Sequence, residues 1–138
     1  MTRCAPRGVP SAPARRRLAL ALALSGVVGL AWASPARVFP ADALRGELTV
    51  LQPPEALLGK TPVRLAPGAR IRDPQNLMVL SGALVGQRLD VRYTVDTSGL
   101  LMNVWILTAE ERTQPWPRTR AEAAAWRFDP VAQRWSRP

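Results

Sequence analysis

Three tryptophans in the last quarter of the chain alternate with arginines, and this is the pattern best suited to bind a ligand. Exposed aromatic rings beside guanidinium groups can stack on sugars, bases or lipid headgroups. The binding hypothesis names Trp116, Trp126, Trp135, Arg118 and Arg127. The other interpretation is that the tryptophans fold back and cap the open end of a barrel. We favour it, because so small a domain without disulfides needs the buried area.

A second basic group lies in the middle of the chain and could form a patch beside Tyr93. Its members are Arg64, Arg70, Arg72, Arg88 and Arg92. On a small barrel such a patch could bind single-stranded nucleic acid. Asp73, Asp90 and Asp96 interrupt it, and an exported protein does not meet that ligand. We therefore favour a solvated face, with contact to a glycan or an anionic lipid as the remaining functional meaning.

The residues suited to acid–base or nucleophilic catalysis are few. Asp90 and Asp96, with Ser81 and Ser98, alternate with core positions and should face water. The chain has no histidine, which excludes the common Ser-His-Asp and Cys-His nucleophiles. Without histidine and cysteine, the usual zinc, copper and haem ligand sets cannot be built either. We expect no catalytic residue, no metal site and no cofactor.

The amino-terminal third has the three parts of a secretory signal in their usual order. An uncharged apolar run, Leu18–Leu30, follows a basic opening and precedes the small-x-small site Ala31–Ala33. The run is shorter than the roughly 20 residues of a membrane-spanning helix. We predict cleavage between Ala33 and Ser34. The alternatives are an uncleaved inner-membrane anchor, which also places the chain in the periplasm, and a buried helix of a cytosolic protein.

Cleavage would change the character of the chain. It removes the lone Cys4 and five of the 19 basic residues, which leaves 14 bases against 10 acids and a net charge of about +4 in place of +9. About 105 residues remain, the size of one small domain. Small exported domains often rely on disulfides, so this one must be held by packing or by a partner.

From residue 44 to residue 107 the chain shows short alternating segments and frequent turn signals. We expect about five or six strands, at Leu44–Val50, Ala56–Leu58, Val63–Leu65, Ala69–Ile71, Leu89–Val95 and Leu100–Leu107. The last two predict a β-hairpin. So many short strands in so few residues favour a mostly β fold, a small barrel that hides its edges. OB-like is the first choice and SH3-like the second.

The end of the chain is different in character. Residues 111–117 are polar and Pro-rich and predict a linker, and Thr119 with Glu122 forms a capping box for a short helix. Phe128 and Trp135 could face each other across a small terminal hairpin, the alternative being a frayed tail. The predicted organisation is a signal (1–33), a connecting segment (34–43), a barrel domain (44–109) and an extension (110–138).

The segment from Glu47 to Leu107 is similar to small exported proteins of Gram-negative bacteria with an OB-like domain of uncharacterised function. A strand, a turn like Ala83–Gln87 and a hairpin with a Gly-containing loop carry the resemblance. It implies a fold and assigns no functional residue.

These observations together predict a non-enzymatic periplasmic or secreted β-barrel that acts as a binding or envelope-associated accessory module. Its expected partner is an envelope protein, a glycan or an anionic lipid surface, and not nucleic acid. A carboxylate-dependent envelope enzyme or enzyme subunit is the alternative from another class. A membrane-surface protein held by an uncleaved anchor is the third.

The first testable prediction concerns processing. Mass spectrometry of fractionated cells should find a soluble chain that begins at Ser34, because signal peptidase cuts after small-x-small sites. A chain that keeps residues 1–33 and stays in the membrane fraction would contradict cleavage and support the anchor.

Overall fold

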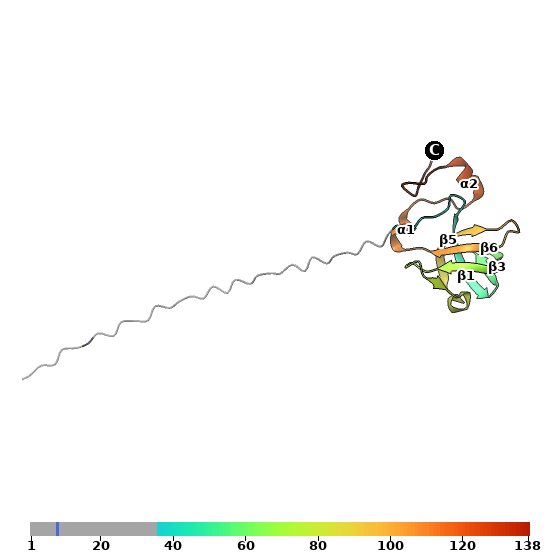
Figure 1. Cartoon of the computed structure of the whole chain (residues 1–138), viewed down its shortest axis with the longest axis horizontal. Coiled ribbons are helices and arrows are strands. Elements are labelled where there is room, and N and C mark those ends of the chain that lie inside the picture. Colours follow the sequence, from blue (N-terminus) through green and yellow to red (C-terminus); the bar gives the residue numbers. More distant parts are fainter. Residues whose placement is uncertain (1–7, 9–35) are drawn as a thin grey trace, which may run out of the picture. The chain divides into compact units, whose positions relative to one another are not determined.

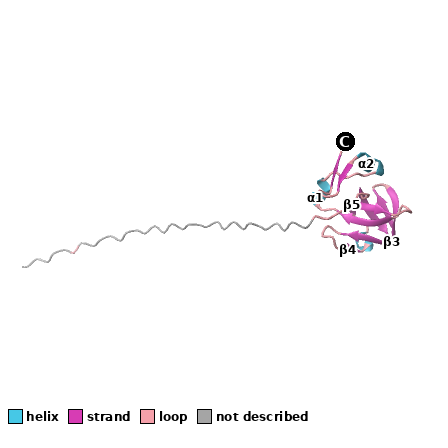
Figure 2. Ribbon diagram, turned by 45° about the horizontal axis from the view of Figure 1, so that its top comes forward, coloured by secondary structure: helices cyan, strands magenta, loops and turns pink. Residues whose placement is uncertain are grey.

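The computed structural model describes Gly8 and residues 36–138. The predicted signal, except Gly8, and Ser34 lie outside the described residues. From residue 36 on, the chain belongs to one compact unit, which is mostly β-strand (Figure 2). No helix in this part of the chain is long and apolar enough to cross a membrane.

Six strands form the main sheet, and five of them close into a ring. The strands are β1 (Leu44–Gln52), β2 (Glu55–Leu58), β3 (Thr61–Arg72), β4 (Met78–Val79), β5 (Arg88–Val95) and β6 (Leu101–Ile106). Pairing runs β1–β2–β3–β6–β5 and returns to β1, and each pair is antiparallel except β3–β6. In the described residues β4 pairs with β3 alone, so it lies at an edge of the sheet.

Apolar side chains at alternating strand positions fill the inside of the ring. Leu48, Val91 and Val104 come from three different strands and are completely buried in one apolar cluster. Where β1 passes β5, Gly46 leaves room for Tyr93, because a Cβ at this glycine would lie 3.2 Å from the tyrosine ring. The period of two in the sequence therefore corresponds to a packed interior.

The predicted hairpin of β5 and β6 is confirmed, and so is the turn at Gly59–Lys60 that joins β2 to β3. Gly59 has a φ of +61°, which a glycine adopts without strain. The prediction of two separate strands around Pro67–Gly68 is wrong. β3 continues through these residues, and only its pairing with β6 is interrupted, between Leu65 and Arg70.

The carboxyl-terminal part forms a second layer. It contains α1 (Ala109–Thr113), α2 (Arg120–Ala125), β7 (Arg127–Asp129) and β8 (Arg134–Ser136), while the 3₁₀ helix η1 (Ser81–Leu84) lies between β4 and β5. The terminal hairpin is confirmed, with Phe128 opposite Trp135. Thr119 caps α2 as predicted by accepting a hydrogen bond from the Glu122 N–H.

The predicted linker at 111–117 needs correction, because its start belongs to the helix α1. Thr108 and Glu111 form a reciprocal capping box, in which each side chain accepts a hydrogen bond from the other residue's backbone N–H. The box satisfies two N–H groups that a helix start leaves free.

The second layer lies over the outer face of the ring (Figure 1). Side chains that alternate with the core form a row across β1, β5 and β6, in which Arg45 is opposite Arg92 and Arg92 is opposite Trp105. Trp105 packs in a second apolar cluster with Phe39, Ala43, Trp116 and Trp135, which we call the outer cluster. Around Arg92 and Trp105 the sheet is therefore buried on both faces.

A core substitution tests the ring. Leu48→Ala should lower the free energy of unfolding by about 2–5 kcal/mol, because Leu48 is fully buried and the change leaves a cavity. Leu77→Ala, at an exposed leucine, is the matched control and should change it by less than about 0.5 kcal/mol. Urea denaturation measures both, and equal losses would contradict the assignment of the core.

Candidate functional site

Two of the three predicted tryptophans lie in the core of the second layer. Trp116 and Trp135 are buried, with ring centroids 6.1 Å apart in an edge-to-face arrangement. The Trp116 indole N–H donates to the carbonyl of Ala43 at 2.8 Å. These two side chains hold the extension on the ring and leave no free face for a ligand to stack on.

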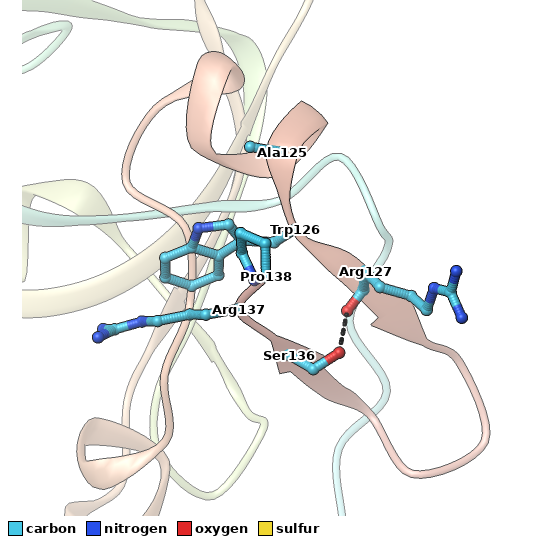
Figure 3. Close-up of a pocket in the computed structure, with 6 residues that line it drawn as sticks. All are labelled: Ala125, Trp126, Arg127, Ser136, Arg137 and Pro138. Atoms are coloured by element: carbon cyan, nitrogen blue, oxygen red, sulfur yellow. Dashed lines mark hydrogen bonds between the residues drawn. The ribbon is translucent and has the colours of Figure 1, made fainter.

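The third tryptophan is half-buried beside a shallow groove of about 500 Å³ at the terminal hairpin (Figure 3). The Arg137 guanidinium lies 4.9 Å from the centroid of the Trp126 ring, and Arg127 points away from that ring. Of the five predicted residues, Trp126 and its sequence neighbour Arg127 line this groove. Arg118 is exposed and does not line this groove. Ligand binding here stays a prediction.

The basic residues of the middle of the chain do not form one continuous patch. Arg64 pairs with Glu55 at 3.0 Å on an exposed surface, and Arg88 lies 3.9 Å from Glu47. Such exposed pairs contribute little to stability. Arg92 differs from the others, since it is only 1% exposed.

Arg92 packs against two aromatic rings of the outer cluster that also contact each other edge to face, with centroids 5.7 Å apart. Its guanidinium carbon lies 4.3 Å from the centroid of Phe39 and 3.7 Å from that of Trp116. Its Nη2 donates to the Glu111 carbonyl and to Gln114 Oε1, at 3.3 Å and 3.2 Å, while its buried Nε has no partner. Burial lowers the pKa of Arg92 to about 10, opposed by Glu111, so the group is still a cation at neutral pH.

The carboxylate nearest Arg92 is that of Glu111, which already has other partners. Glu111 forms an ion pair with Arg37 and also accepts a hydrogen bond from the Thr108 N–H. Arg37 further donates to the carbonyls of Asp73 and Ile106, at 2.8 Å and 2.7 Å. Burial raises the pKa of Glu111, but its bonds to Arg37 and Thr108 outweigh this and lower the pKa overall.

The predicted catalytic candidates have structural surroundings. Asp96 Oδ1 accepts hydrogen bonds from the N–H groups of Ser98 and Leu100 and closes the β5–β6 turn. Asp90 lies 4.0 Å from Arg112, and Ser81 begins η1. Among the described residues, no three His, Cys, Asp or Glu side chains are grouped so that they could hold a metal ion.

Exposed apolar side chains gather at the sheet edge formed by β4. Leu77, Met78 and Leu80 are 64%, 60% and 82% exposed. Beside them is a groove of about 290 Å³ lined by Pro53, Pro54, Leu65, Ala66, Gly68, Ala69, Ile71, Met78, Val79, Leu80 and Ser81. We call this region the β4 surface. The sequence shows an apolar run at 77–80 and no strand is predicted there, and such a run does not show that these residues lack a covering layer.

No protein-family model, curated protein or solved structure matches this chain.

Replacing each tryptophan separates core from surface. Trp116→Ala should lower the free energy of unfolding by about 3–5 kcal/mol, because it removes a buried ring and leaves Arg92 without one of its two aromatic neighbours. Trp126→Ala, at a half-buried ring outside that contact, should cost clearly less. Thermal denaturation measures both, and a larger loss for Trp126→Ala would contradict this division.

Proposed function

We propose that this chain is an exported, non-enzymatic OB-like β-barrel that binds an extended segment of an envelope protein on the β4 surface. The order of pairing supports the OB-like part of the proposal. Without β4, five strands close a ring with a single parallel pair, as expected for a small Greek-key barrel. In such barrels the β2–β3 face and the adjoining loops are a common binding surface. The β4 surface lies on β3 and includes the β1–β2 turn at Pro53–Pro54.

The observation that carries the proposal is the exposure of Leu77, Met78 and Leu80 around an edge strand. A free strand edge presents unpaired backbone N–H and C=O groups to another chain. Proteins commonly protect such edges with lysine, proline or a bulge, and the two residues of β4 are Met78 and Val79. Exposed apolar side chains grouped beside a groove mark an interaction surface.

An extended polypeptide fits this surface better than a glycan or a lipid headgroup does. Added as a strand, it would pair with the backbone of β4, and alternate side chains would enter the groove over Ala66 and Ile71. Arg70 and Arg72, on the neighbouring part of β3, give the margin a positive charge. We therefore expect a segment in which apolar residues alternate and acidic residues lie at the ends.

The two alternatives have less support. Glu110 and Glu111 line one cavity, as a carboxylate enzyme would require. The ion pair of Glu111 with Arg37 lowers the pKa of that carboxyl and makes it a poor proton donor. The hypothesis of an anchored membrane-surface protein requires that residues 1–33 are kept. The position of the mature amino terminus tests this hypothesis.

Site-specific photo-crosslinking in living cells tests the proposal. A photoreactive amino acid at Leu80 should give a discrete crosslinked adduct with an envelope protein, and mass spectrometry should map it to an extended segment of that protein. Val131, also apolar and 94% exposed but in the β7–β8 turn, is the matched control position and should give none.

Substitutions in the β4 surface provide a second test. Leu77→Ser together with Leu80→Ser should reduce the adduct formed from a probe at Met78 at least tenfold, with an unchanged melting temperature. Val131→Ser should leave that adduct unchanged. Equal crosslinking from residues 80 and 131, or an adduct that survives the double substitution, would overturn the proposed surface.

A further inference from the structure

The cavity beside Arg92 is distinct from the β4 surface and has its own chemistry. It measures about 180 Å³ and lies between the connecting segment, α1 and the β7–β8 turn. Arg37, Phe39, Arg92, Glu111, Gln114 and Gln133 are among its lining residues. It is thus built from five stretches of the chain that are separate in sequence, and a cation that is 1% exposed forms part of its wall.

The charge of this cation is incompletely balanced. Among the described residues, no carboxylate lies within 4.0 Å of the Arg92 guanidinium, because Glu111 is paired with Arg37. The hydrogen bonds that Arg92 donates are long and end on neutral oxygens, and its Nε donates none. A buried charge normally requires a partner of opposite charge. Contacts with two aromatic rings supply part of the compensation.

The surrounding charges favour a small anion with a single charge. Arg37 and Arg45 add positive potential at Arg92, and Glu111 opposes it. Glu110, which is exposed, also lines the cavity. Two or three cations and two carboxylates lie near one another, so their net charge is small. A singly charged carboxylate therefore suits the cavity better than a doubly charged phosphate. The planar guanidinium also matches the geometry of a carboxylate.

We propose that this cavity is a binding site for a carboxylate group, with Arg92 as its cationic residue and the amides of Gln114 and Gln133 at its sides. The ligand is either a free small carboxylic acid or the terminal carboxylate of a peptide. The site is independent of the β4 surface, so either proposal can fail without the other.

Acetate is the first probe, titrated into the protein at an ionic strength held constant with sodium chloride. The Nε–Hε resonance of Arg92 in a ¹⁵N spectrum should shift and saturate. The melting temperature should rise by about 5–10 °C at ten times the dissociation constant, because the ligand binds the folded state alone. A resonance that does not move would mean that the cavity holds only water, and would overturn the proposal.

A matched pair of variants locates the effect. Arg92→Met replaces a buried cation with an apolar side chain of similar length. It should abolish the response to acetate, whereas Arg120→Met, at an exposed arginine outside this cavity, should leave it intact. An equal response in both variants would show general surface binding and overturn the site. If Arg92→Met does not fold, the Arg92 resonance in the unaltered protein decides whether acetate binds in this cavity.

Two further comparisons identify the ligand. N-acetylglycylglycine is compared with its carboxyl-terminal amide, and both are compared with acetate. Tighter binding of the peptide acid than of acetate, with no binding of the amide, would assign a chain terminus. Binding of acetate that the peptide acid does not exceed would assign a free acid. Tighter binding of inorganic phosphate than of acetate would overturn the carboxylate assignment.

Discussion

The second layer of this protein is organised around one buried cation. Arg92 belongs to the sheet, yet both rings that hold its guanidinium come from outside the strands, Phe39 from the connecting segment and Trp116 from the extension. The guanidinium contacts both rings where they meet edge to face, and two such contacts in a desolvated place are worth about 2 kcal/mol or more apiece. The same side chain therefore sets where both segments lie on the ring. Arg37 reinforces this arrangement by joining Glu111 of α1 to the carbonyls of Asp73 and Ile106.

Much of the ring could be predicted because its signals are local. The alternation in β5 and β6 and the glycine turn before β3 depend on residues close in sequence, and so does the pairing of Phe128 with Trp135. The continuity of β3 through Pro67–Gly68 could not be predicted, because proline and glycine punctuate a chain in sequence, while the strand here only loses part of its pairing to β6. α1 was missed for a different reason, since the prolines at 115 and 117 hid the capping box at Thr108 and Glu111.

The candidate sites were harder to find than the fold. Arg92 has the sequence surroundings of a surface residue in an alternating strand, and only the covering of the outer face by distant segments buries it. Trp116 and Trp135 are buried, as favoured, but they pack with Trp105 on the outer face of the sheet and do not cap the open end of a barrel. A sequence also does not show which aromatic ring stays half-exposed. Conversely, Leu77, Met78 and Leu80 form only a short apolar run in the sequence. Their exposure depends on the fact that no element of the described chain is placed over β4.

The outer cluster has a consequence for the order in which the chain can fold when it emerges amino end first, as it does during synthesis. Phe39 meets Trp116 and Trp135 in this cluster, and the Phe39 N–H donates to the side chain of Gln133, 94 residues away. All strands of the ring precede Trp116, so the ring can form before the two tryptophans are available. Until then the outer face of β5 and β6 stays hydrated. Contacts of such long sequence separation also form slowly. A chain arrested before Trp116 would thus keep Arg92 hydrated and its outer strands open to proteases, so that protection of this face requires both ends of the cluster.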